Sequence, residues 1–414
     1  MNISIWVLAV VFIVIAVRRI GPVHVPIWQA MGGGALAVLL AGEMPWREAW
    51  EAVDWEVMVF LFGMFVVGQA LVASGYLYYL AYRLFGRIAS GQGLLLAVLF
   101  GMGLTSALLM NDTLAIIGTP LALRLAREHE LDESMMLLAV AFSVTLGSLM
   151  SPIGNPQNLL VATHGHLAEP FIDFLAALAV PSLLNLALAF LWLRRVYRRT
   201  FHEVVLLHRP VAVLDQDLAR LSRLSLWIVV VLTGCKIALA LSDASFQFGL
   251  SSIALAAAAP LLLFSRERGA ILRHLDWPIL LFSAAMFVLM ASVWSSGFFQ
   301  GWLSRLPFSL HGMPAVLAVS LGLSQLISNV PLVALYLPIL SENGAGLPEL
   351  MALAAGSTLA GNLLILGAAS NVIIIQHAEK HGATLGFFQF ARIGIPLTLI
   401  NLLVYWAWLS WYFR

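Results

Sequence analysis

The sequence is poor in cysteine and in charge, and each scarcity excludes a class of protein. A single cysteine, Cys235, cannot form an intrachain disulfide framework or a clustered thiolate metal site. Only 10% of the 414 residues are charged, whereas about 25% is usual for a soluble domain. The net charge of +1 argues against nucleic acid as a partner, because nucleic-acid-binding domains carry strongly basic faces.

Hydrophobic residues are abundant instead, at 61% of the chain. A water-soluble fold cannot bury so much apolar surface, and stretches of about 20 apolar residues match a bilayer core about 30 Å thick. We therefore predict an all-α polytopic integral membrane protein. The expected membrane-crossing helices cover 3–17, 24–42, 54–75, 171–193, 224–241, 247–265, 276–297 and 388–412.

Four other apolar stretches are interrupted by polar residues. Stretches 92–127 and 313–341 contain polar groups in their middle, and 134–163 and 349–380 are broken by segments rich in Gly, Ser and Asn. Irregular backbone at membrane depth is tolerated only where it lines a site. We interpret the first two stretches as re-entrant hairpins and the last two as broken helices.

The four interrupted stretches form two matched pairs, which indicates an internal repeat. Asp54-Trp55 opens one half and Asp276-Trp277 opens the other. Four residues recur 213 positions later: Thr145, Gly154, Asn158 and His164 correspond to Thr358, Gly367, Asn371 and His377. Such repeats are typical of secondary transporters.

The distribution of arginine predicts that the two halves are inverted. Cytoplasmic loops are enriched in Lys and Arg, and the arginines place Asp54 outside, Asp276 inside and both termini outside. The expected domains are N-terminal transmembrane helices (1–53), a first inverted repeat (54–193), a cytoplasmic linker (194–223), scaffold helices (224–275) and a second inverted repeat (276–414).

Asp112 lies at the tip of the first hairpin with apolar sequence on both sides. An ionisable group at membrane depth is costly and usually functional, although an Asp at a helix start also caps free amides. Half-helix amino ends attract anions or polar solutes, and Asn, Ser and Thr oxygens suit a small hard cation. We expect one site from Asn111, Asp112, Thr113, Gly154, Asn155 and Asn158, and a second from Ser328, Asn329, Gly367, Ser370 and Asn371.

Other polar residues are given structural interpretations. Lys236 lies in the outer half of a span, from which a lysine can reach the interface. His164, His166, His377 and His381 lie at span ends, where we expect solvated side chains. We find no Ser-His-Asp or phosphate-loop arrangement, so we expect no enzyme, no catalytic residue and no metal centre.

Three motifs resemble the ion-transporter superfamily, most closely its branch of arsenite permeases and sodium/proton antiporters, with the dicarboxylate carriers as relatives. The motifs are Met110-Asn111-Asp112-Thr113 with Thr119-Pro120, the run from Ser151 to Asn158 (SPIGNPQN), and Ser328-Asn329-Val330-Pro331. The resemblance covers nearly the whole chain. It implies two re-entrant hairpins, two broken helices, a homodimer and an elevator-like movement of the transport domain.

The hairpin tips depart from the Ser-Asn-Thr triplets of dicarboxylate carriers. An ionised Asp112 would repel a dianion by several kcal/mol, and Val330 lacks a hydroxyl group. A protonatable Asp112 fits a carrier of a neutral solute, and arsenite is mostly a neutral trihydroxide at physiological pH. The leading hypothesis is therefore proton-coupled efflux of arsenite or antimonite.

Three alternatives stay open: a sodium/proton antiporter, a sodium-coupled dicarboxylate-like anion carrier, and a channel or receptor. The expected partners are a small inorganic solute and the lipid bilayer, and a cytosolic ATPase docking on 194–223 is compatible with the sequence but not required by it. No cofactor is expected beyond a proton or sodium gradient. The expected location is a bacterial or archaeal inner membrane.

Overall fold

The computed structural model describes most of the chain. The described residues are 3–17, 19–20, 23–76, 79–80, 83, 88, 90–201, 214–241, 249–298, 312–327 and 329–414. Ser328, one of the predicted site residues, lies outside them, as do residues 202–213 of the predicted linker.

Ten helices and a short 3-10 turn form what we call the hairpin bundle, defined as α6 to α10 with α16 to α20. Both predicted hairpins and both predicted broken helices belong to it. The elements of its first half are α6 (Gly91–Ser106), α7 (Asn111–Glu128), α8 (Glu133–Ser148), α9 (Pro156–His164) and α10 (Pro170–Val196). The elements of its second half are α16 (Met313–Ile327), α17 (Asn329–Glu342), α18 (Leu347–Leu363), η1 (Ile365–Gly367), α19 (Ala369–Lys380) and α20 (Phe387–Tyr412).

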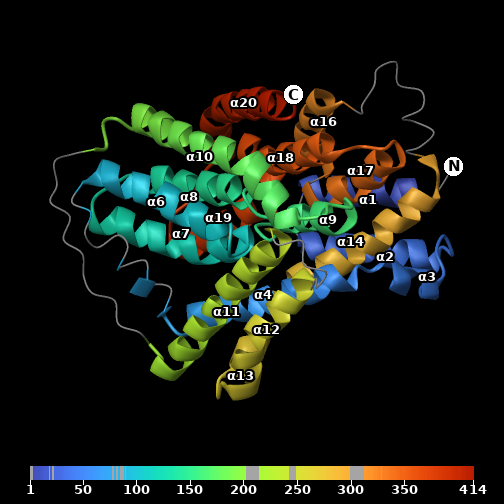
Figure 1. Cartoon of the computed structure of the whole chain (residues 1–414), viewed down its shortest axis with the longest axis horizontal. Coiled ribbons are helices and arrows are strands. Elements are labelled where there is room, and N and C mark those ends of the chain that lie inside the picture. The colour runs from blue at the N-terminus through green and yellow to red at the C-terminus, as the bar shows by residue number, and fades with distance from the viewer. Residues whose placement is uncertain are drawn as a thin grey trace.

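The remaining elements, which we call the outer helices, pack mainly among themselves and against one side of the bundle (Figure 1). They touch the bundle where α4 meets α7 and α9 and where α14 meets α17. They are α1 (Ile3–Val17), α2 (Ile27–Leu40), α3 (Trp46–Ala52), α4 (Trp55–Ala73), α11 (Gln216–Leu241), α12 (Leu250–Phe264), α13 (Arg268–Arg273) and α14 (Trp277–Ser295). A two-residue antiparallel pair, β1 (Arg19–Ile20) with β2 (Val23–His24), follows α1.

The two halves of the bundle exchange their half-helices. In each half the first hairpin arm packs on the first part of the broken helix, α6 on α8 and α16 on α18. The second parts cross over: α19 packs on α7 and α9 packs on α17. Figure 1 shows the hairpin arms α6 and α7 at one end of the molecule and α17 at the other, as an inverted repeat requires. The prediction of an all-α polytopic membrane fold is confirmed.

The predicted membrane-crossing helices differ in length. Within the described residues five helices are long and apolar enough to cross a bilayer, namely α4, α10, α11 over Gln216–Lys236, α14 and α20. The helices at three other expected spans, α1, α2 and α12, have 15, 14 and 15 residues. At 1.5 Å per residue these reach about 22 Å, less than a bilayer core of about 30 Å.

Side-chain caps set several helix starts. Oδ1 of Asp54 accepts from the Val57 amide at 3.1 Å at the start of α4, and Asp132 does the same for Met135 at 2.9 Å at the start of α8. Ser90 caps α6 through the Gly93 amide. These acceptors satisfy amides that have no partner within their own helix, so each helix begins at a defined residue.

Glycine brings helices of the bundle into backbone contact. A Cβ atom added at Gly147 of α8 would collide with the backbone of Gly103 in α6, and one at Gly356 of α18 would collide with the Leu317 carbonyl of α16. Small residues at such crossings allow close packing, which drives helix association in membranes where lipid is as apolar as the side chains. The close approach holds each hairpin against its broken helix.

Gly147→Ala is therefore expected to lower stability by roughly 1–3 kcal/mol, because the methyl group has only backbone to displace. Gly33→Ala in α2 is the matched control, since a Cβ there meets open space. The control should leave stability unchanged or raise it slightly, as Ala favours helix. Thermal unfolding in detergent measures both, and equal melting temperatures would contradict the proposed contact.

Candidate substrate and ion site

At the break between α8 and α9, asparagine side chains form hydrogen bonds with the polar groups that the break leaves free. Oδ1 of Asn155 caps α9 by accepting from the Asn158 amide at 2.8 Å, while its Nδ2 donates to Oγ of Ser148 at 2.9 Å. Nδ2 of Asn158 donates to the carbonyls of Ser148 at 3.0 Å and Ser151 at 3.1 Å. Buried polar groups are costly without partners, so these side chains replace the helix bonds lost at the break.

Thr358 of α18 joins this break from the other half of the chain. Its hydroxyl donates to Oδ1 of Asn158 at 3.4 Å and accepts from Nε2 of Gln157 at 3.2 Å and Nδ2 of Asn155 at 3.4 Å. All four side chains are buried. One hydroxyl group therefore ties the second half of the bundle to the broken helix of the first.

The break between α18 and α19 repeats only part of this network. Nδ2 of Asn371 donates to the Gly361 carbonyl, as Nδ2 of Asn158 does to Ser148, and both pairs are related by the 213-residue shift. The counterpart of the Thr358 bond is missing. Among the described residues, the buried Oγ1 of Thr145, Oγ of Ser370 and Oδ1 of Asn371 have no hydrogen-bond partner. The second break therefore has buried oxygens without partners, whereas the corresponding network at the first break is hydrogen-bonded.

The first hairpin tip is joined to the first break and to an outer helix. The Asn111 amide donates to the Gly154 carbonyl at 2.9 Å, and Oδ1 of Asn111 accepts from the Asp112 amide at 2.9 Å. A Cβ atom added to Gly68 of α4 would lie 2.5 Å from the methyl carbon of Thr113. The absence of a side chain at Gly68 lets the tip rest against α4.

Asp112 is the only Asp, Glu, Lys or Arg that is fully buried in the described part of the chain, with 4% of its surface exposed. Asp276, at the start of α14, lies close enough to act on it electrostatically. Neither hairpin tip nor broken segment contains Lys, Arg or His in residues 110–113, 151–158, 329–331 and 364–371. The carboxyl group therefore has no cationic residue beside it in these segments.

The two predicted sites differ in how closely the structure joins them. Hydrogen bonds link Asn111 to Gly154 and Asn155 to Asn158. By contrast, Asn329, Ser370 and Asn371 each have a buried side-chain oxygen without a hydrogen-bond partner among the described residues. The predicted sites do not include Thr145 and Thr358, although the 213-residue spacing of this pair was the available signal. They also do not include Gln325, whose Nε2 donates to the Ala360 carbonyl at 2.7 Å and for which the sequence gives no signal.

Hairpins, broken helices and polar tips inside an apolar bundle are the architecture of a membrane transporter. A sequence model of the citrate transporter family matches residues 9–347. The chain therefore belongs to the citrate transporter family of the ion-transporter superfamily, and it is a secondary transporter.

Relatives support this assignment over nearly the full length. The chain is 27% identical to the 46 kDa membrane protein of Mycobacterium leprae, over 97% of this chain and 96% of that protein. It is 25% identical to the human P protein, over 89% of this chain and 55% of the P protein. The solved YdaH transporter of Alcanivorax borkumensis shares the fold, with a TM-score of 0.58 at 17% identity and coverage of 99% and 97%.

Thr358→Val is expected to destabilise the protein by roughly 1–3 kcal/mol, because three buried amide groups lose their partner. Thr145→Val is the matched variant at the related position, where the hydroxyl has no partner to lose. It should leave the stability of the protein without solute unchanged. Thermal unfolding of both variants in detergent measures this difference, and equal losses would contradict the asymmetry of the two breaks.

Proposed function

We propose that the protein exports a small uncharged oxyacid, arsenite or antimonite, in exchange for protons, with Asp112 as the proton carrier. The observation that carries the proposal is the burial of Asp112, the one fully buried Asp, Glu, Lys or Arg of the described residues. A carboxyl group in such surroundings is costly to ionise and is suited to binding and releasing a proton during transport.

The charges around the tip favour a neutral solute over an anion. The amino ends of α7 and α9 meet at the Asn111–Gly154 contact, and each helix end contributes about half a positive charge. Together they approximately balance one ionised carboxylate. A di- or trianion such as a dicarboxylate or citrate would need further cationic groups, and the tips and broken segments hold no Lys, Arg or His.

The groups available for recognition are hydroxyls and amides. Thr145, Asn329, Ser370 and Asn371 each offer a buried atom without a partner in the described part of the chain. A trihydroxide can both donate to and accept from such groups. A cysteine-based site for arsenic is not supported, since Cys235 is exposed on α11. Weak oxygen and nitrogen contacts suit a carrier that must release its solute.

Sodium/proton antiport is the second candidate, and the same free oxygens favour it. Sodium is a hard cation that prefers oxygen ligands, as other hard cations do. In this case Asp112 would still carry the proton, and the oxygens of Thr145, Ser370 and Asn371 would contact the cation. The two candidates differ in solute and agree on the role of Asp112.

We further propose that the hairpin bundle moves as a unit against the outer helices. The support is that, among the described residues, the two groups touch mainly at α4 with α7 and α9 and at α14 with α17. A rigid body carrying both breaks would expose the site to each side of the membrane in turn.

Transport in proteoliposomes tests the proposal. With an imposed pH gradient, we expect saturable movement of arsenite or antimonite that stops when the gradient is abolished. Sodium and citrate are parallel arms: sodium-dependent proton movement without arsenite transport would favour the antiporter, and citrate transport alone would favour the anion carrier.

Asp112→Asn should remove the dependence of transport on the pH gradient, because the amide cannot ionise. Asp217→Asn is the matched control, as this carboxylate is 84% exposed and pairs with Arg220 at 3.3 Å. The control should transport like the original protein. Retained proton coupling in Asp112→Asn, with folding verified by thermal unfolding, would exclude Asp112 as the carrier.

A further inference from the structure

The outer helices and the hairpin bundle meet at a charged contact between Asp54 and His164. Asp54 precedes α4, and His164 is the last residue of α9. Asp276 precedes α14, and Lys380, the last residue of α19, acts on it electrostatically. The internal repeat relates His164 to His377 rather than to Lys380, so the two pairs differ in chemistry.

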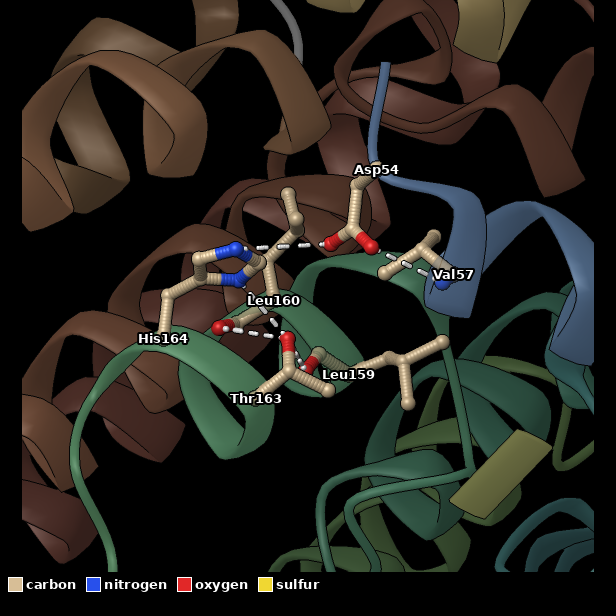
Figure 2. Close-up of polar contacts among 6 residues, drawn as sticks. All are labelled: Asp54, Val57, Leu159, Leu160, Thr163 and His164. Atoms are coloured by element: carbon tan, nitrogen blue, oxygen red, sulfur yellow. Dashed lines mark hydrogen bonds and ion pairs between the residues drawn. The ribbon is translucent and has the colours of Figure 1, made fainter. Parts of the chain in front are cut away.

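Asp54 is held in place for this contact. Its Oδ1 accepts from the Val57 amide at 3.1 Å and so belongs to the cap of α4 (Figure 2). Its Oδ2 is buried without a hydrogen bond and lies 3.5 Å from Nε2 of His164. The Asp54 side chain is 11% exposed and that of His164 is 55% exposed, so the imidazole remains open to protons from water.

Thr163 orients the imidazole of His164. The Thr163 hydroxyl donates to the Leu159 carbonyl at 2.9 Å, and Nδ1 of His164 lies 2.8 Å from the same oxygen (Figure 2). The hydroxyl has one proton, which it can donate to the Leu159 carbonyl or to Nδ1, so Nδ1 is the donor when the hydroxyl proton points to Leu159. Nε2 faces the Asp54 carboxylate favourably when it carries a proton. The imidazolium form, in which both ring nitrogens donate, is compatible with both contacts.

Asp54 is the ion-pair partner of His164 among the described residues. Other charged groups belong to the elements around it. Arg47 and Glu51 of α3 pair with each other at 3.2 Å, and Glu349 of α18 accepts from the Gly346 amide. The remaining ones are Glu48 of α3, Glu56 of α4, Glu342 at the end of α17, and His166 and Glu169 after α9.

The basic residue that acts on Asp276 is a lysine rather than a histidine. A lysine keeps its charge through the physiological range, whereas a histidine changes charge between about pH 5 and 8. Of the two basic residues, His164 is the one whose residue type can change charge in this range.

We infer that His164 is a second proton-binding residue of this transporter, separate from Asp112, and that its protonated form ties the hairpin bundle to α4 through Asp54. Loss of the proton removes the attraction and frees α9 from α4. Acid on this face of the molecule then favours the position of the bundle seen here. The inference rests on the proposed movement of the bundle against the outer helices.

Distance measurements between two spin labels test the inference without a transported solute. The labels are placed at Glu48→Cys on α3 and Ala168→Cys after α9, two exposed positions, in full-length protein with Cys235→Ser. Between about pH 5 and about pH 8 the population of the bundle position favoured by acid should fall roughly twofold to fivefold, as expected for a partly exposed ion pair.

Variants at position 164 separate charge from shape. His164→Lys should keep the acid distribution at both pH values, because lysine stays charged through this range, and His164→Gln should keep the alkaline one. His166→Gln is the matched control and should retain the shift. Asp112→Asn should retain it as well, so that failure of the proton carrier and failure of this inference give different results. A shift that persists in His164→Gln, or no shift in the original residues, would overturn the inference.

Discussion

The backbone groups freed where a helix breaks inside a membrane need partners within the protein, because lipid offers none. This requirement governs the centre of the molecule. At the first break Asn155 and Asn158 supply the missing donors and acceptors, and Thr358 completes them from the other half. The asparagines are therefore structural at one break, and the same residue type at the second break, Asn371, is left with a free oxygen.

Inverted repetition gives the protein two similar breaks, and small substitutions make them chemically different. Replacing the amide side chains of Asn155 and Gln157 by Ala368 and Ser370 leaves Thr145 without the partners that Thr358 has. A carboxyl group at one hairpin tip adds a second difference. A symmetric scaffold can thus provide one break whose polar groups are paired, which favours rigidity, and one with unpaired oxygens that a solute can contact. The helix crossings at Gly147 and Gly356 hold the first arm of each hairpin against its broken helix.

The order and type of helices could be predicted because apolar length and polar interruption are local properties of the sequence. The hairpin predicted over 92–127 forms as α6 and α7, and the broken helix over 134–163 forms as α8 and α9. The burial of Asp112 was also predictable, since apolar residues surround it on both sides. The bounds of α1 match the predicted 3–17, whereas α2 and α12 are shorter than predicted, because hydropathy extends into residues that cap or link a helix.

The sequence by itself determined the membrane class, the paired interruptions and the residue types at each tip, because these follow from composition and spacing along the chain. Only the tertiary structure decided which part of the molecule each polar side chain contacts. Thr358 reaches Asn158 across 200 positions, and Asp54 reaches His164 between an outer helix and the bundle. Such contacts depend on how helices cross in space, and the crossing is set by close packing that no local pattern records.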